Sequence, residues 1–212
     1  MVRKYRAVLF DLLTALIDSW RLWNEVAGSL EVGRKWRGEY LRLTYGCGRY
    51  RAYEDVVADA AESVGLGRQY ADQLASSWAR LTPWPEAGPV LAGLSKSHKL
   101  GVVTNCSERL GRIAAERVGV RFEVMVTAER AGFYKPDPRP YRLAIEELGV
   151  TATQTLFVAG SGYDLFGTSK VGLDTYWHNR VGMAAPEGAP PPMVQRPSLS
   201  ELSDIALLAT TE

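Results

Sequence analysis

Four clusters of polar side chains in this sequence could carry out chemistry, and each follows a short apolar run. The first is a single carboxylate, Asp11, directly after Ala7–Phe10. The others are Thr104–Ser107, Phe133–Pro138 around Lys135, and Gly160–Asp164. Asp11, Asp164 and Lys135 thus offer two carboxylates and one ammonium group, with hydroxyl and amide groups beside them. Because an ammonium favours the ionised form of a nearby carboxylate, such a set can provide a charged oxygen nucleophile.

The elements that must position these clusters follow from the apolar pattern. Short buried strands are predicted at 7–10, 99–104, 124–127, 156–159 and 175–178, and helices at 90–94, 110–118, 141–148 and 165–171. Helices that alternate with short apolar strands predict an α/β fold, with a parallel sheet covered on both faces. The carboxyl ends of parallel strands meet at one edge of the sheet, so the four clusters are expected around one crevice.

Each cluster also has a purely structural interpretation. Asp11 could cap a turn after its strand, and Asp164 could cap the helix that follows it. Thr104 or Ser107 could begin a helix, and Lys135 could be a solvated surface lysine. Four such coincidences, each after a strand, explain the pattern less well than one shared site.

A helical insert is predicted between residues 19 and 80, where apolar and aromatic residues recur at intervals of three and four. Glycines at 33, 46–48 and 65–67 are expected to divide it into about four helices. Aromatic residues at helical spacing usually serve packing, and most of these are interpreted in that way.

Two chain crossings should join the insert to the sheet. Thr82–Pro85 is a stiff return linker because two prolines restrict its backbone. The outward crossing is expected near Ala15–Asp18. The predicted domains are a core of residues 1–16 plus 86–212 and an insert of residues 17–85.

The C-terminal part is expected to be less regular. Residues 184–197 are rich in proline and alanine and are predicted to form an irregular surface excursion. Residues 198–208 are predicted to form a closing helix, opened by a capping box of Ser198 and Glu201.

Composition excludes several classes of function. The 212 residues hold 25 basic and 24 acidic side chains, so no overall charge favours nucleic acid. The two cysteines, Cys47 and Cys106, fit no metal spacing and agree with a reducing compartment. The first residues lead straight into a strand without a signal peptide, and no apolar run has membrane-spanning length. We therefore expect a cytoplasmic protein that contacts neither nucleic acid nor membrane.

The order of the clusters resembles the haloacid dehalogenase superfamily of Rossmann-like hydrolases. The matching positions are an aspartate after the first strand, a threonine after the second, a lysine before a proline, and an acid after the fourth: Asp11, Thr104, Lys135 and Asp164. The resemblance implies a Rossmann-like, doubly wound parallel sheet with an inserted helical cap domain. It also implies that Asp11 is the nucleophile.

The sequence departs from the magnesium-dependent phosphatases of that superfamily. Leu13 stands where they carry a second aspartate, and Ala159–Ser161 lacks the extra acid that holds their metal. Since magnesium prefers an octahedral oxygen shell, Asp11 and Asp164 alone are a poor site for it. We therefore expect neither a metal nor another cofactor.

These departures resemble the cofactor-independent 2-haloacid dehalogenases. The shared features are a Lys-Pro-Asp-Pro motif, a tyrosine six residues after its lysine, a Trp-x-Asn-Arg ending, and a Trp-Arg pair in the cap: Lys135–Pro138, Tyr141, Trp177–Arg180 and Trp36-Arg37. The resemblance implies hydrolysis of short 2-haloalkanoic acids to 2-hydroxy acids. The partners would be the haloacid and a halide ion, and a homodimer is possible.

The first step of this chemistry is a displacement. Asp11, kept ionised by Lys135, would attack the carbon that carries the halogen and form an ester. The backbone N–H groups of Leu12 and Leu13, with the Thr104 hydroxyl, would hold the substrate carboxylate.

The second step is hydrolysis of the ester. Arg37 and Asn105 would first receive the departing halide. Water activated by Asp164, and oriented by Ser161 or Lys135, would then attack the ester carbonyl and regenerate the nucleophile.

Some alternatives stay open. Arg37 could be an exposed helix arginine. Tyr141 could support Lys135 or the pocket, or could be a core tyrosine. Thr14-Ala15 replaces the Gly-Thr usual in that branch, where the threonine hydroxyl helps to orient the nucleophile. The rival functions are a phosphatase with a degraded metal site and a non-catalytic member that binds a small anion or a partner protein.

One substitution tests the nucleophile directly. Asp11→Asn removes the attacking charge while keeping the side-chain size, so it is expected to abolish halide release from 2-chloropropionate. Halide production by the purified variant measures this. Release at the wild-type rate would show that Asp11 is not the nucleophile.

Overall fold

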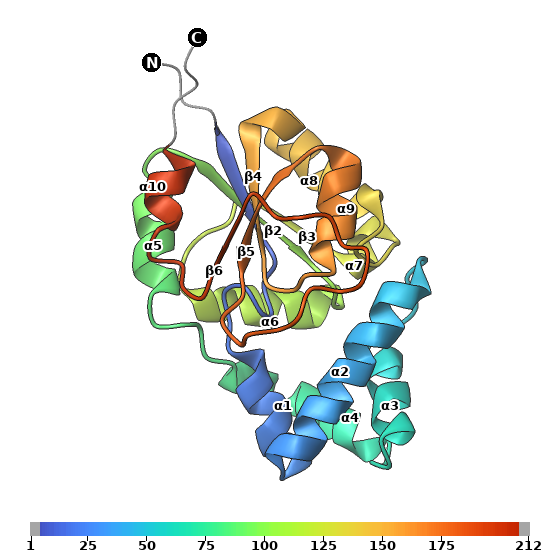
Figure 1. The fold of residues 1–212 in the computed structure, drawn as a ribbon. Helices are drawn as coiled ribbons and strands as arrows, with labels where there is room; N and C mark the ends of the chain where they lie inside the picture. The colour runs from blue at the N-terminus through green and yellow to red at the C-terminus, as the bar shows by residue number, and fades with distance from the viewer. Residues whose placement is uncertain (1–4, 208–212) are drawn as a thin grey trace.

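The computed structural model describes residues 5–207. They form a six-stranded parallel sheet, with a separate group of helices beyond the carboxyl ends of its strands (Figure 1). The strands lie in the order β3-β2-β1-β4-β5-β6. They are β1 (Ala7–Phe10), β2 (Lys99–Thr104), β3 (Val124–Thr127), β4 (Thr155–Ala159), β5 (Asp174–His178) and β6 (Val194–Arg196). The predicted α/β fold is confirmed, and β1 occupies the interior of the sheet.

Helices cover both faces of the sheet. They are α5 (Ala87–Leu94), α6 (Glu108–Val118), α7 (Ala128–Ala131), α8 (Pro138–Leu148), α9 (Asp164–Val171) and α10 (Leu202–Ala206), with a short 3-10 turn, η2, at Ala152–Gln154. In Figure 1, α5 and α10 lie on one side of the sheet and α8 and α9 on the other. Successive β1 side chains enter two hydrophobic cores, with Val8 and Phe10 in one and Ala7 and Leu9 in the other. A strand buried on both faces needs a continuous apolar run, as β1 has.

Two C-terminal predictions were wrong. Part of 184–197 forms β6, which pairs in parallel with β5. With three residues and one apolar side chain, β6 is too short to show a strand period.

The closing helix is also shorter than predicted, because α10 covers only Leu202–Ala206. The capping box does not form. Ser198 Oγ instead donates to Glu86 at 3.1 Å, and Glu201 pairs with Arg196 at 2.9 Å. Residue 208 lies outside the described range.

The insert contains the four helices expected, followed by a 3-10 turn. They are α1 (Ser19–Ala27), α2 (Leu30–Cys47), α3 (Tyr53–Ser63), α4 (Gln69–Ser76) and η1 (Trp78–Arg80). The break predicted at Gly33 is wrong, because α2 runs through it and the chain turns at Gly28, where φ is 69°. A Cβ at Gly33 would lie 2.5 Å from Asn24 Cα, so this glycine allows α1 and α2 to pack closely.

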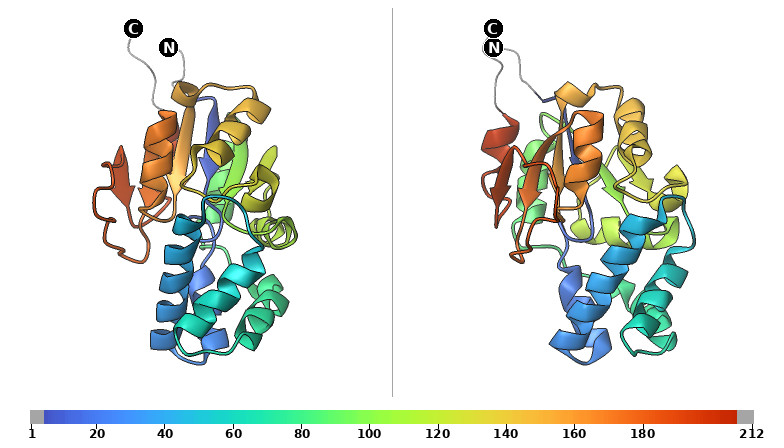
Figure 2. Two further views of the ribbon diagram at one scale, coloured as in Figure 1. Left: turned by 90° about the vertical axis from the view of Figure 1, so that its right-hand side faces the viewer. Right: turned by 45° about the vertical axis from the view of Figure 1, so that its right-hand side comes forward.

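The insert lies beyond the carboxyl ends of the strands, as both views of Figure 2 show. The two crossings pair with each other. An antiparallel bridge joins Ile17 and Pro83, Asp18 N donates to Thr82 O at 2.9 Å, and Trp84 N donates to Leu16 O at 2.9 Å. Among residues 5–207, no helix is long and apolar enough to cross a membrane.

Gly33→Ala should separate α1 from α2, because the new methyl group meets the backbone of Asn24. We expect it to lower the free energy of unfolding by about 1–3 kcal/mol, measured by urea denaturation. Gly38→Ala is the control in the same helix. A Cβ at Gly38 meets nothing within 4 Å, so this change should be neutral or stabilise by up to about 1 kcal/mol. Equal effects of the two substitutions would contradict the close packing of α1 on α2.

Candidate active site

The strand ends bring together two carboxylates and one ammonium. Lys135 Nζ lies 2.9 Å from Asp11 Oδ1 and 3.0 Å from Asp164 Oδ1. Asp11 follows β1, Lys135 comes from the loop after α7, and Asp164 begins α9. Their exposed fractions are 8%, 1% and 0%, so Lys135 is not a surface lysine. A buried triad of this kind keeps its charges only because each one has an opposite partner.

Burial and the neighbouring charges of the triad shift the pKa values of Lys135 and Asp164. Burial lowers the pKa of the Lys135 ammonium, but Asp11 and Asp164 outweigh this effect and leave it above its usual value. Burial raises the pKa of Asp164, and Lys135 opposes that rise. Tyr141 Oη donates to Asp164 Oδ1 at 2.7 Å. Asp164 Oδ2 is buried and accepts no hydrogen bond from any described residue, so one oxygen of this carboxylate is left without a partner in the described chain.

The other oxygen of Asp11 is held by the backbone. Asp11 Oδ2 accepts from Thr14 N at 3.1 Å and from Ala15 N at 3.3 Å. Within the described chain, the N–H groups of Leu12 and Leu13 donate to no protein acceptor. The turn after β1 therefore orients Asp11 and leaves these two N–H groups without a partner in the described chain.

Arg37 reaches this turn from α2 and is 1% exposed, so it is not a surface arginine. Its Nη2 donates to Thr14 Oγ1 at 2.9 Å, and its guanidinium lies 4.8 Å from the Trp20 ring centroid and 5.3 Å from that of Trp23. Its Nε and Nη1 have no partner among the described residues. Burial lowers the pKa of this guanidinium. A buried cation with unused donors is a ready site for an anion.

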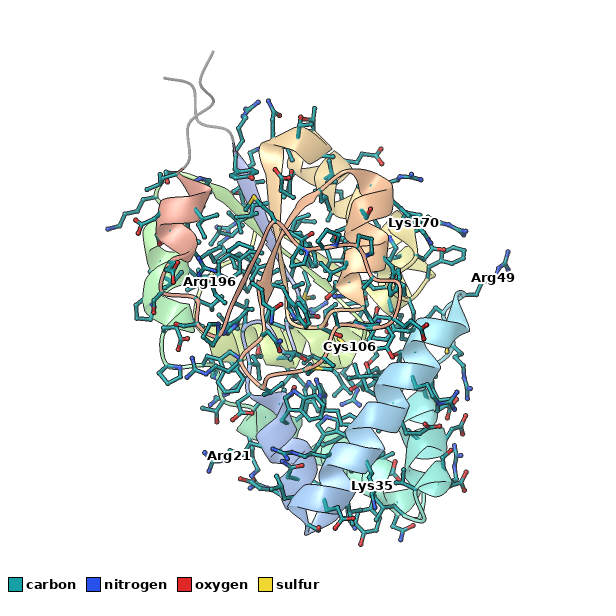
Figure 3. The ribbon with its side chains drawn as sticks, in the orientation of Figure 1. Arg21, Lys35, Arg49, Cys106, Lys170 and Arg196 are labelled. Carbon is teal, nitrogen blue, oxygen red and sulfur yellow. The ribbon has the colours of Figure 1, made fainter. Side chains whose placement is uncertain are left out.

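The surface cations of the insert behave differently. Arg21 and Lys35, labelled in Figure 3, point away from the sheet, and their side chains are 69% and 65% exposed. Each one pairs with a glutamate four residues along its own helix. Cys106, also labelled, lies between the sheet and the insert, where burial raises the pKa of its thiol to about 12. This cysteine is therefore not a nucleophile at neutral pH.

A small cavity separates the insert from the strand ends. Its volume available to water centres is about 20 Å³, which is room for roughly one molecule. The lining residues are Asp11, Leu13, Thr14, Arg37, Tyr40, Leu41, Tyr45, Thr104, Asn105, Lys135 and Ser161. Of the residues predicted for the site, three are not in this lining: Leu12, Tyr141 and Asp164. Asp164 pairs with Lys135, which does line the cavity.

Asn105 is tied to the backbone of Lys135. Lys135 N donates to Asn105 Oδ1 at 2.7 Å, and Asn105 Nδ2 donates to Lys135 O at 3.0 Å. This pair of bonds fixes the segment from which the ammonium extends. Thr104 is buried at the end of β2, and Ser161 Oγ accepts from Tyr163 N at 3.3 Å.

Sequence reasoning missed several lining residues on α2. Tyr40 Oη donates to Asn105 O at 2.7 Å, and Tyr45 stacks on Tyr163 with ring centroids 4.2 Å apart. Leu41 lines the cavity beside them. All three follow Arg37 at helical spacing, and that spacing was the signal that could have found them.

A divalent cation does not fit this site. Lys135 Nζ lies within 3.0 Å of one oxygen of each carboxylate. The ammonium therefore contacts the oxygens that a metal ion would need as ligands. Within the described part of the chain, no three His, Cys, Asp or Glu side chains are grouped so that they could hold a metal ion. Magnesium needs a near-octahedral set of oxygen ligands, which Asp11 and Asp164 alone do not supply.

Comparison with known proteins places the geometry in context. A family model described as haloacid dehalogenase-like hydrolase matches residues 8–178. The chain is 29% identical to (S)-2-haloacid dehalogenase 4A of Burkholderia cepacia, over 95% of each protein. It is 27% identical to haloacetate dehalogenase H-2 of Moraxella sp. (strain B), over 88% of this chain and 91% of that one. A crystal structure of a dehalogenase with an intermediate complex is 26% identical, with a TM-score of 0.84 over 99% of this chain and 100% of that one.

Arg37→Met tests the anion site. It removes a buried charge that has no carboxylate partner, so the free energy of unfolding should stay equal or rise by up to about 2 kcal/mol. Bromide should raise the melting temperature of the wild type and leave that of the variant unchanged, because only the wild type binds the ion.

Arg42→Met is the matched control for this prediction. Arg42 lies on the same helix, is 66% exposed and pairs with Glu39, so its loss should leave the bromide effect intact. Undiminished bromide stabilisation of Arg37→Met would contradict the anion site.

Proposed function

Because the chain belongs to the haloacid dehalogenase-like hydrolases, we propose that it hydrolyses short 2-haloalkanoic acids to 2-hydroxy acids. The observation that carries this proposal is the buried triad of Asp11, Lys135 and Asp164 together with the Arg37 guanidinium, two of whose nitrogens have no partner in the described chain. A nucleophile on one side of a small cavity and an anion site on the other suit the displacement of a halide. Relatives named as 2-haloacid and haloacetate dehalogenases support the same reaction class.

In the first half-reaction, a carboxylate oxygen of Asp11 attacks C2 of the substrate. The new C–O bond forms as the carbon–halogen bond breaks, and the halide leaves with the electron pair toward Nε and Nη1 of Arg37. The N–H groups of Leu12 and Leu13 hold the substrate carboxylate together with the Thr104 hydroxyl. The single displacement inverts the configuration at C2.

In the second half-reaction, water hydrolyses the ester. Asp164 Oδ2, which has no donor among the described residues, accepts a proton from the water while the water oxygen attacks Cγ of Asp11. Ser161 or Lys135 orients the water. The ester C–O bond breaks, the leaving alkoxide takes the proton held by Asp164 to give the 2-hydroxy acid, and the second proton of the water is released to solvent, which regenerates Asp11 as a carboxylate. The raised pKa of Asp164, caused first by its burial, makes it a better base than an exposed aspartate.

The helical insert of residues 17–85 is proposed to act as a cap domain. The cavity has room for about one water molecule, with about 20 Å³ available to water centres, so we propose that the insert moves away from the strand ends when a haloacid enters. Tyr45 and Tyr163 meet across this boundary, as do Tyr40 and the Asn105 backbone. These contacts stabilise the closed arrangement.

The rival functions lack a favouring observation. Leu13 is an apolar side chain where a phosphatase needs a general acid, and Lys135 pairs with both carboxylates. A module that only binds an anion has no need of the second buried carboxylate at Asp164. A homodimer and a cytoplasmic location stay predictions from the sequence.

A panel of 2-haloacids tests the proposal. We expect purified protein to release halide from 2-chloropropionate and monohaloacetates, and a chelator should not change the rate. Ion chromatography of the halide, with Asp11→Asn as the inactive control, measures this. Magnesium-dependent phosphate release from phosphate monoesters without halide release would identify a phosphatase, and no turnover of either kind would favour a binding protein.

A further inference from the structure

The return linker carries a side chain that reaches the hydrogen-bonding partners of the proposed nucleophile. Trp84 Nε1 donates to Thr14 O at 2.9 Å. That carbonyl belongs to the same peptide unit as Ala15 N–H, which donates to Asp11 Oδ2 at 3.3 Å. We propose that Trp84 is a positioning residue, which holds this peptide so that its N–H group fixes the Asp11 carboxylate. The inference rests on the proposed function only in its kinetic consequence.

The same peptide is also confined from the core. A Cβ at Gly160 would lie 2.7 Å from the carbonyl carbon of Thr14, so the chain after β4 packs directly on it. His178 Nδ1 lies 2.8 Å from Ala15 O. Because a carbonyl only accepts, that ring nitrogen carries the proton and donates it. The turn around Asp11 is thus fixed by β4, by β5 and by the linker.

Trp84 is itself held in place. The Arg180 guanidinium lies 5.0 Å from its ring centroid, and the ring meets that of His178 edge-on at 6.3 Å. Arg180 in turn pairs with Glu86 at 2.5 Å. An indole fixed by these contacts presents its N–H at a constant position, as a positioning group must.

The residues at 14 and 15 explain why such support matters. Residue 15 is an alanine, so no side-chain hydroxyl is available there to orient the nucleophile. Asp11 Oδ2 depends instead on the N–H groups of Thr14 and Ala15. Backbone donors keep their direction only if their peptide units are fixed, and Trp84 fixes the second of them.

Trp84→Phe removes the indole N–H but keeps an aromatic ring for packing. We expect kcat for halide release to fall about tenfold, while KM changes less than about twofold, because the attacking oxygen is misaligned and substrate contacts are kept. We also expect faster hydrogen exchange of the backbone amides at residues 12–16, measured by mass spectrometry.

Trp78→Phe is the matched control. Trp78 Nε1 also donates to a carbonyl at 2.9 Å, but that carbonyl is Leu110 O in α6, which does not belong to a peptide that donates to Asp11. Its loss should change neither kcat nor exchange at 12–16. Trp84→Tyr, which also lacks the indole donor, replaces Trp84→Phe if the latter does not fold.

The outcomes separate this inference from the proposed function. If both Trp variants show equal kcat values, or if exchange at 12–16 is unchanged in the Trp84 variant, the positioning role is wrong although dehalogenation stands. If the wild type releases no halide, the proposed function fails, and faster exchange at 12–16 in the Trp84 variant alone still supports the role of the indole in holding the peptide.

Discussion

The ammonium of Lys135 between Asp11 and Asp164 is the interaction on which the rest of the site depends. Two carboxylates buried at one sheet edge repel each other and resist ionisation unless a cation lies between them. The protein meets this need by fixing the lysine backbone through both polar atoms of the Asn105 amide. The parallel sheet supplies the geometry, because β1, β2 and β4 end side by side. The parallel sheet therefore brings the two carboxylates together, and the lysine between them allows both to stay ionised.

Arg37 adds a second buried cation, for a different reason. Unlike Lys135, it has no carboxylate within hydrogen-bonding distance, and two of its donor groups are unused in the described chain. The aromatic residues that the sequence suggested were packing do pack, with Trp23 and Trp36 centroids 4.5 Å apart. Trp20 and Trp23 also form the surface on which the guanidinium rests. One cluster therefore packs the insert and holds the buried cation that is proposed to bind the halide.

Much of the fold could be predicted because its signals are local. The apolar runs of β1, β2 and β4 and the polar residues after them are visible in the sequence, and parallel topology then brings the clusters together. The sixth strand was missed because it is too short to show a strand period, and the last helix was predicted too long because its capping box does not form. The glycine at 33 was misinterpreted because a helix interior tolerates glycine where a neighbouring backbone needs the space. Helical spacing from Arg37 could have placed Tyr40 and Tyr45 in the cavity lining, but it could not predict their individual partners, the Asn105 carbonyl and the Tyr163 ring.

If the insert opens as proposed, the paired crossings at Ile17 and Pro83 would act as its hinge. Two independent tethers would let the helices twist as well as swing. Tethers that are hydrogen-bonded to each other behave as one ribbon, which bends most easily across its flat side. The proposed opening would then be a hinge rotation about a single axis. Substrate would enter at the side of the molecule opposite the paired crossings.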